Sequence, residues 1–290
     1  TDSSAIAALS NTINSNRFIG SANLTYTPDW LPGLTFNGLV GIDAIDYTNI
    51  AFSPPGFFYP GIEFKGEKTS FSRMRRQMNY EFNAGYAYDI TGAISAVTTV
   101  GTQLFNNYTN FSEVTMQNFG SKKVTNLYGA TDFIVSDDGN SDFKEAGVFF
   151  NQDFNFYDRY FLTLGMRNDY SSVIGEEAPS IFYPRVSGAV RLDRFGWDLG
   201  PVNFMKFRAG YGQNGQLPGL LSAYPLRWGG GQSGFGVGAL ITSIGNDEIK
   251  PERIQEYEFG LETEFLNAYG FDFTYYYSFA EESIIGFPNP

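Results

Sequence analysis

Alternation of apolar and polar residues over long segments is the feature of this sequence that most restricts its fold. Between Gln77 and Asp89 the even positions hold Met, Tyr, Phe, Ala, Tyr and Tyr, and the odd positions hold mainly polar or small residues. Successive side chains of a β-strand point to opposite faces. The segment therefore predicts a strand with one apolar face and one polar face.

The same period of two recurs along the whole chain. It is strongest at 34–43, 77–89, 160–169, 205–212, 256–265 and 271–279, and weaker near 17–27, 92–105, 143–155 and 184–193. These segments predict an all-β, antiparallel fold of about ten strands.

The connections between these segments alternate between short and long. Short ones lie near 28–33, 89–92, 156–158, 194–202 and 266–268, and long ones near 47–75, 106–142, 171–183 and 213–251. Outer-membrane barrels combine tight periplasmic turns with long external loops. Aromatic residues beside the short connections, such as Trp30 and Trp197, suit the membrane interface. We therefore predict a transmembrane β-barrel of a bacterial outer membrane, with the long connections outside the cell.

Composition excludes several functions. The formal net charge of -12 disfavours a nucleic-acid partner, because phosphate backbones attract basic surfaces. The absence of Cys and His excludes zinc sites built from those residues, thiol nucleophiles and Ser-His-Asp hydrolases. No segment approaches the ~18 apolar residues of a membrane-spanning helix. We expect no enzymatic activity, no cofactor and no metal.

Alternation also assigns faces. Tyr80, Phe82, Phe259, Leu261, Phe271 and Phe273 are expected to face lipid, and Asn79, Glu81, Glu258, Glu262 and Asp272 the lumen. The candidate lumen-lining residues are Asn79, Glu81, Arg167, Arg185, Arg208, Glu256, Glu258 and Glu262. Arg167, Arg185, Arg191 and Arg208 are candidate partners for the glutamates on neighbouring strands. A glycosidase could also use carboxylates at this spacing, but a hydrated lumen wall is the preferred interpretation.

Aromatic residues in the long connections are candidate ligand contacts, since rings stack on sugars and line pockets. The candidate substrate-binding residues are Phe57, Phe58, Tyr59, Tyr211, Asn214, Tyr224 and Trp228. Packing of the loops against one another, Phe52 included, explains these aromatics equally well.

Three further motifs have simpler interpretations than a binding site. The segment 210–215 spells G-x-G-x-x-G, but no helical period follows it, which disfavours a dinucleotide site. The acidic segment 136–142 lacks the spacing of a calcium loop and suits a solvated loop. Arg73, Arg75 and Arg76 could bind lipopolysaccharide phosphates or simply be solvated.

Residues 145–290 resemble the SusC/RagA family of TonB-dependent outer-membrane transporters. The resemblance lies in segments 156–172 and 208–215, and above all in the sequence Gly-Asn-Asp-Glu-Ile-Lys-Pro-Glu at 245–252, which precedes a Glu-rich strand. Tyr170 departs from the glycine that the family often has after the strand arginine. In the first half of the chain the resemblance is limited to the general character of the sequence.

This resemblance implies a barrel of about 22 strands that is plugged by an N-terminal domain, energised through TonB and often covered by a SusD-like surface lipoprotein. It implies uptake of oligosaccharides or peptides. Residues 1–290 are then expected to be a partial barrel domain without the plug and the TonB-contacting segment. We expect the segments 17–27 and 269–283 to be unpaired edges. Small inward residues such as Gly165 and Gly260 also favour a wide barrel.

Two other classes of protein fit the pattern. One is a passive porin-type barrel, or a small barrel closed by these ten strands alone. The other is a soluble secreted β-protein that binds glycans, because sandwiches also alternate.

Overall fold

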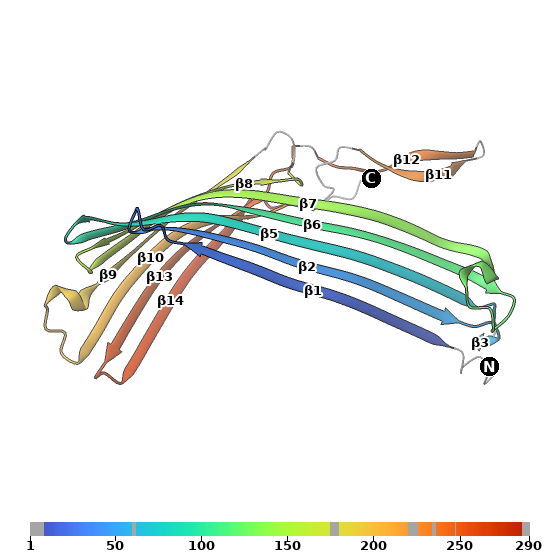
Figure 1. Cartoon of the computed structure of the whole chain (residues 1–290), viewed down its shortest axis with the longest axis horizontal. Coiled ribbons are helices and arrows are strands. Elements are labelled where there is room, and N and C mark those ends of the chain that lie inside the picture. The colour runs from blue at the N-terminus through green and yellow to red at the C-terminus, as the bar shows by residue number, and fades with distance from the viewer. Residues whose placement is uncertain are drawn as a thin grey trace. The chain divides into compact units, whose positions relative to one another are not determined.

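The computed structural model describes residues 9–59, 62–174, 180–219, 226–233, 236–246 and 248–285. Ten strands form one sheet in the order β1-β2-β5-β6-β7-β8-β9-β10-β13-β14 (Figure 1). Their bounds are β1 Ser10–Tyr26, β2 Leu34–Ser53, β5 Glu67–Thr91, β6 Ile94–Phe119, β7 Ala130–Phe156, β8 Tyr160–Ser171, β9 Ile181–Arg191, β10 Val202–Gln216, β13 Glu252–Phe265 and β14 Tyr269–Glu281. The predicted all-β antiparallel fold is confirmed.

Two hairpins lie outside this sheet. β3 (Phe57–Tyr59) pairs with β4 (Ile62–Phe64), and β11 (Leu226–Ser233) pairs with β12 (Gly236–Ile244). Two 3₁₀ turns, η1 (Leu127–Gly129) and η2 (Leu192–Phe195), complete the described elements. No helix in the described part of the chain is long and apolar enough to cross a membrane.

The sheet is open. β1 and β14 stand at its two ends, and the described residues contain no pairing between them. The predicted edge strands are therefore confirmed, and a ring closed by these ten strands alone is not what the chain forms.

Several strands are much longer than predicted. β5, β6 and β7 have 25, 26 and 27 residues, more than twice the ~9–11 that cross a bilayer. The loops expected at 47–75 and 106–142 are wrong in extent, because only residues 54–66 lie between β2 and β5, and only residues 120–129 lie between β6 and β7. Where both faces of a strand meet water, both can carry polar residues. The apolar–polar alternation is then lost from the sequence although the strand continues.

Cross-strand hydrogen bonds show that β5 and β6 remain paired in these polar parts. Thr69 and Thr115 share a hydrogen bond of 2.8 Å, and Ser72 and Ser112 one of 2.9 Å. The acidic segment 136–142, expected to be a loop, lies inside β7. Asp137 therefore points to one face of the sheet, and Asp138 and Asp142 point to the other.

Contacts divide the chain into two compact units. The first comprises Thr1–Ala22, Val40–Asn79 and Phe105–Phe143, and the second Asn23–Leu39, Tyr80–Leu104 and Lys144–Pro290. The first unit has a small core of Phe52, Phe119 and Ala130. The rings of Phe52 and Phe119 meet edge to face at 5.2 Å, so Phe52 is a packing residue and not a ligand contact.

The short turns lie where they were predicted. Between β7 and β8, Tyr157 and Asp158 have φ values of 58° and 53°, and between β13 and β14, Leu266 and Asn267 both have 53°. Two consecutive residues with positive φ are typical of the type I′ turn, whose twist matches that of paired strands. Asn155 stabilises the first turn, because its Oδ1 accepts a hydrogen bond of 3.0 Å from the Asp158 N–H.

Candidate functional site

Strand register in the second unit separates charged from apolar side chains. Arg208 on β10 lies opposite Gly260 on β13, and Phe207 lies opposite Leu261. Directly opposed residues share a face of the sheet. The polar face so defined carries Asn151, Asp153, Thr163, Arg167, Arg185, Ser187, Arg191, Lys206, Arg208, Glu256, Glu258, Glu262 and Asp272. The apolar face carries Leu162, Leu164, Val186, Val190, Phe207, Ala209, Phe259, Leu261, Phe271 and Phe273.

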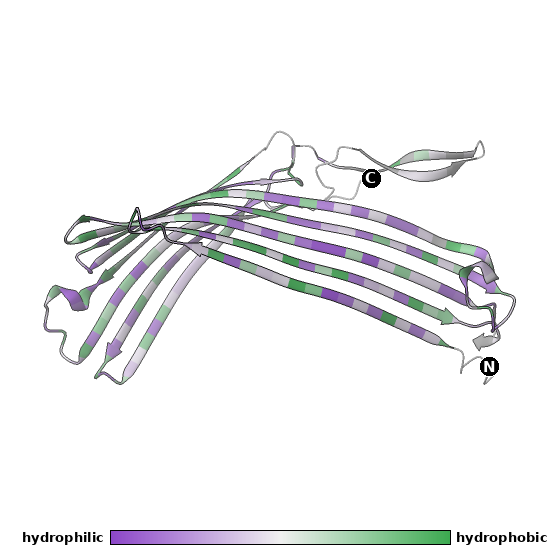
Figure 2. Ribbon diagram, in the orientation of Figure 1, coloured by the Kyte–Doolittle hydropathy of each residue, from purple (hydrophilic) through white to green (hydrophobic). Residues whose placement is uncertain are grey.

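Figure 2 displays this separation as hydrophilic and hydrophobic bands that alternate along each strand. The large apolar residues are exposed in the sheet, with Phe207 at 47% and Phe259 at 54%. An exposed aromatic face of this extent needs an apolar medium or another polypeptide to cover it.

A network centred on Arg208, the Arg208 cluster, is the main charged feature of the polar face. Arg208 Nε donates to Glu258 Oε1 at 3.2 Å, Nη1 donates to Glu262, and Nη2 donates to Asp272 Oδ1 at 3.4 Å. Lys206 Nζ also contacts Glu262, at 3.4 Å. The predicted pairing of Arg208 with the glutamates is confirmed, and the cluster joins β10, β13 and β14.

Gly260 allows the Arg208 side chain to extend across β13 to β14. A Cβ on Gly260 would collide with the Nε, Cγ and Cζ atoms of Arg208. The missing side chain leaves a passage across β13 by which the guanidinium reaches Thr274 Oγ1 on β14. Gly260 is therefore required for the geometry of the Arg208 cluster.

Among the described residues, two of the other predicted arginines make their hydrogen bonds to side chains other than glutamate. Arg167 Nε lies 2.6 Å from Asp169 on its own strand, and Arg185 Nη2 donates to Asn151 Oδ1 at 3.4 Å. No carboxylate stands directly opposite either residue, so no cross-strand hydrogen bond to a glutamate supports the expected pairing among the described residues. The positions directly opposite them are Phe149, Tyr183, Gly165 and Gly212.

Arg191 also pairs locally and not with a glutamate. Its Nη2 lies 2.6 Å from Asp193 Oδ2 in the turn after β9. Burial raises the pKa of Asp193, but hydrogen bonds from Arg191 and from the Met205 N–H outweigh it and hold the pKa below its usual value. The carboxylate therefore stays ionised and fixes the end of β9.

The polar face contains a hollow of about 460 Å³ beside the Arg208 cluster. Its lining includes Thr163, Ser187, Ala189, Arg191, Lys206 and Arg208. Its three cations are those already paired with Asp193, Glu258, Glu262 and Asp272.

Asn79 and Glu81 lie on the odd-numbered face of β5. Asn79 Cβ is 4.0 Å from the position that a Cβ on Gly41 would take in the first unit. In the second unit, Glu81 Oε1 accepts a hydrogen bond of 3.5 Å from Asn83, which in turn accepts one of 3.0 Å from Asn37. Both candidate residues therefore belong to polar rows of the sheet.

The candidate substrate-binding residues belong to several different elements. Tyr211 lies on the apolar face, where its ring is 4.9 Å from that of Tyr257, whereas Asn214 lies on the face of Arg208. The backbones of Phe57–Tyr59 and Trp228 belong to the two outlying hairpins. Tyr224 lies outside the described residues.

The three arginines considered for lipopolysaccharide have partners within the first unit. Arg73 lies over the ring of Tyr47 at 5.7 Å, and Arg75 and Arg76 lie 3.9 and 4.0 Å from Asp43 and Asp46. Asp43 is held more closely by Arg17, at 2.6 Å. In the part of the chain that the structure describes, no three acidic side chains gather in a way that could hold a metal ion.

Comparison with known proteins agrees with this geometry. Residues 2–285 match the family model described as TonB dependent receptor-like, beta-barrel. The solved structure of the RagAB peptide transporter superposes with a TM-score of 0.90 at 17% identity, over 98% of this chain and 32% of that one. The RagAB peptide importer in its closed-closed state gives 0.85 at 16% identity, over 93% and 30%.

A more distant match is the siderophore receptor PiuA from Acinetobacter baumannii, with a TM-score of 0.53 at 12% identity, over 92% of this chain and 40% of that one. At these identities the likeness concerns the fold. The chain spans about a third of the length of the RagAB chains that it matches. No curated protein sequence matches it.

Proposed function

Because the chain belongs to the TonB-dependent receptor-like β-barrel family of bacterial outer-membrane transporters, which are not enzymes, we propose that it forms part of the wall of an active importer of peptides or oligosaccharides. The observation that carries this proposal is the open sheet with the Arg208 cluster on one face and exposed aromatics on the other. In a barrel the first face lines the lumen and the second meets lipid.

Closure of the wall requires further strands. Each unpaired backbone group in hydrocarbon costs several kcal/mol, and this sheet leaves one side of β1 and one of β14 open. Small residues such as Gly165 and Gly210 on the polar face support a wide barrel. The proposed lumen-lining residues are Asn79, Glu81, Arg167, Arg185, Arg208, Glu256, Glu258 and Glu262.

Peptides are the cargo that we propose first, because the matching RagAB structures are described as a peptide transporter and importer. The same match supports a SusD-like lipoprotein as partner, and the family supports energy supply through TonB. The hairpins β3–β4 and β11–β12, which carry Phe57–Tyr59 and Trp228, together with Tyr224 and Asn214, are the proposed cargo contacts. Tyr211, on the apolar face, has no support for such a role.

Uptake by cells that produce the full-length protein tests this function. Labelled oligopeptides and oligosaccharides are supplied with and without a protonophore, and in cells with and without TonB. We expect oligopeptide uptake that stops when either the proton gradient or TonB is removed. Uptake that survives both treatments would identify a passive porin, and uptake of oligosaccharide alone would replace the proposed cargo.

A further inference from the structure

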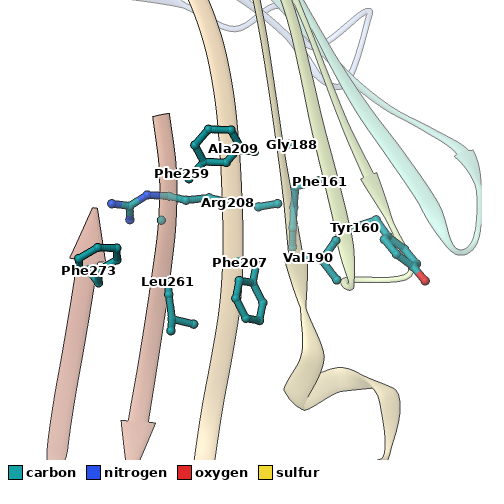
Figure 3. A pocket seen from close by; sticks show the side chains of 12 residues that line it. Tyr160, Phe161, Gly188, Val190, Phe207, Arg208, Ala209, Phe259, Leu261 and Phe273 are labelled. Atoms are coloured by element: carbon teal, nitrogen blue, oxygen red, sulfur yellow. The ribbon is translucent and has the colours of Figure 1, made fainter. Parts of the chain in front are cut away.

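The apolar face of the second unit is not uniformly filled. A hollow of about 650 Å³ opens on it, across β8, β9, β10, β13 and β14. Large side chains surround it, as Figure 3 shows for Phe207 on β10, Phe259 and Leu261 on β13, and Phe273 on β14.

Small residues form the floor of this hollow. Gly188 on β9 and Ala209 on β10 lie directly opposite each other, and Phe259 stands opposite Ala209 on the other side. A Cβ on Gly188 would meet only the Phe161 carbonyl oxygen, at 3.6 Å. The floor is therefore low because Gly188 and Ala209 have little or no side chain, and larger side chains would fit there.

An aromatic group borders the hollow at the end where β9 turns into β10. The ring of Tyr160, which lines the hollow, meets that of Phe195 edge to face at 5.5 Å, and Phe195 lies 5.0 Å from Trp197. Amphipathic rings of this kind sit at the level of lipid headgroups. The hollow thus extends from the interface into the hydrocarbon.

A guanidinium stands at this border. Arg159 Cζ lies 5.4 Å from the centre of the Phe195 ring, and within the described residues it has no carboxylate partner. Arg194, 54% exposed, lies 3.7 Å from Asp193.

The nearby acidic side chains already have hydrogen-bond donors. Asp158 accepts from Asn155 at 2.7 Å, Asp193 from Arg191 at 2.6 Å, and Asp198 from the Gly200 N–H at 2.9 Å. Of these three carboxylates only Asp193 is held by a cation, so Asp158 and Asp198 keep their negative charge, while the Arg159 guanidinium makes no ion pair within the described residues.

We propose that this hollow is a binding site for one glycerophospholipid, with an acyl chain over Gly188 and Ala209 and the phosphate on Arg159. Guanidinium binds phosphate with two parallel hydrogen bonds, and the acyl chain fills the space between the rings. The short-turn end of the sheet faces the periplasm in a barrel of this kind, so the lipid belongs to the periplasmic leaflet. The site is independent of the cargo.

Native mass spectrometry of the full-length protein, released from detergent with phosphatidylglycerol, tests this site. We expect one retained lipid per protein. Ala209→Leu, which fills the floor, and Arg159→Gln, which removes the charge, should each lower the retained fraction at least fivefold. Val186→Phe enlarges a residue of the same face outside the hollow, and Arg253→Gln removes an exposed charge elsewhere. Both controls should leave retention unchanged.

Three results would overturn the proposal: equal retention in all variants, retention of lipid A in preference to phosphatidylglycerol, or a protein dimer that Ala209→Leu dissociates. Gly188→Leu serves as a second filling variant should Ala209→Leu fail to fold, as judged by heat-modifiable migration. Loss of lipid without loss of cargo uptake would separate this site from the proposed transport function.

Discussion

At the scale of single residues, the candidate site could be predicted only in part. Arg208 and the glutamates were identified because they alternate with aromatics on their own strands. The neighbours of Arg167 and Arg185 could not be identified, because the register between two strands cannot be determined from a single sequence. The separation of Tyr211 from Asn214 was predictable, because a spacing of three on a strand places two residues on opposite faces.

Replacement of Gly260 by Ala should destabilise the protein. The new Cβ would collide with Arg208 and displace it from Glu262 and Thr274, at a cost of about 1–3 kcal/mol typical of overpacking. Urea unfolding of the full-length protein in lipid vesicles measures the change. Gly210→Ala is the matched control, because a Cβ there meets Ser187 only at 3.6 Å. Equal stability of the two variants would remove the role assigned to Gly260.

The two faces of β13 should respond differently to charge. Phe259→Arg places a cation on the apolar face, which costs roughly 2–4 kcal/mol near the bilayer midplane. Glu258→Gln removes one partner of a half-exposed ion pair, worth about 0–1 kcal/mol. The same vesicle unfolding measurement compares them, and a larger loss for Glu258→Gln would reverse the assignment of the faces.

At the scale of strands, the ten strands of the main sheet were predictable, but their lengths and the hairpins β3–β4 and β11–β12 were not. Period-two alternation depends on hydrocarbon on one side and water on the other. It therefore reveals a strand such as 77–89 only where it crosses the membrane. β5 begins at Glu67, and its outer residues, among them Thr69 and Ser72, are polar on both faces. Nothing in their hydropathy distinguishes such residues from a loop.

The two kinds of connection should lie on opposite sides of the membrane. The chain has no cysteine, so a single one can be labelled selectively. Lys123→Cys, in the exposed connection between β6 and β7, should react with a membrane-impermeant maleimide on intact cells. Ala268→Cys, in the exposed turn between β13 and β14, should react only after permeabilisation. The opposite pattern would invert the proposed topology.

At the scale of the molecule, the open sheet predicts dependence on additional polypeptide. Residues 1–290 produced alone should not show the heat-modifiable migration of a closed barrel, whereas the full-length protein should, because β1 and β14 keep unpaired edges. Electrophoresis with and without heating compares the two. A heat-modifiable band from residues 1–290 alone would mean that ten strands can close by themselves.

The Arg208 cluster disfavours pairing of β14 in a shifted register. A slip of β14 by one residue would preserve most backbone hydrogen bonds but turn every side chain to the other face. Asp272 and Thr274 would then leave Arg208, and Phe271 and Phe273 would enter the aqueous side. A misaligned strand thus loses its ionic contacts and its lipid contacts together. The cluster therefore favours the single register in which β13 and β14 are paired.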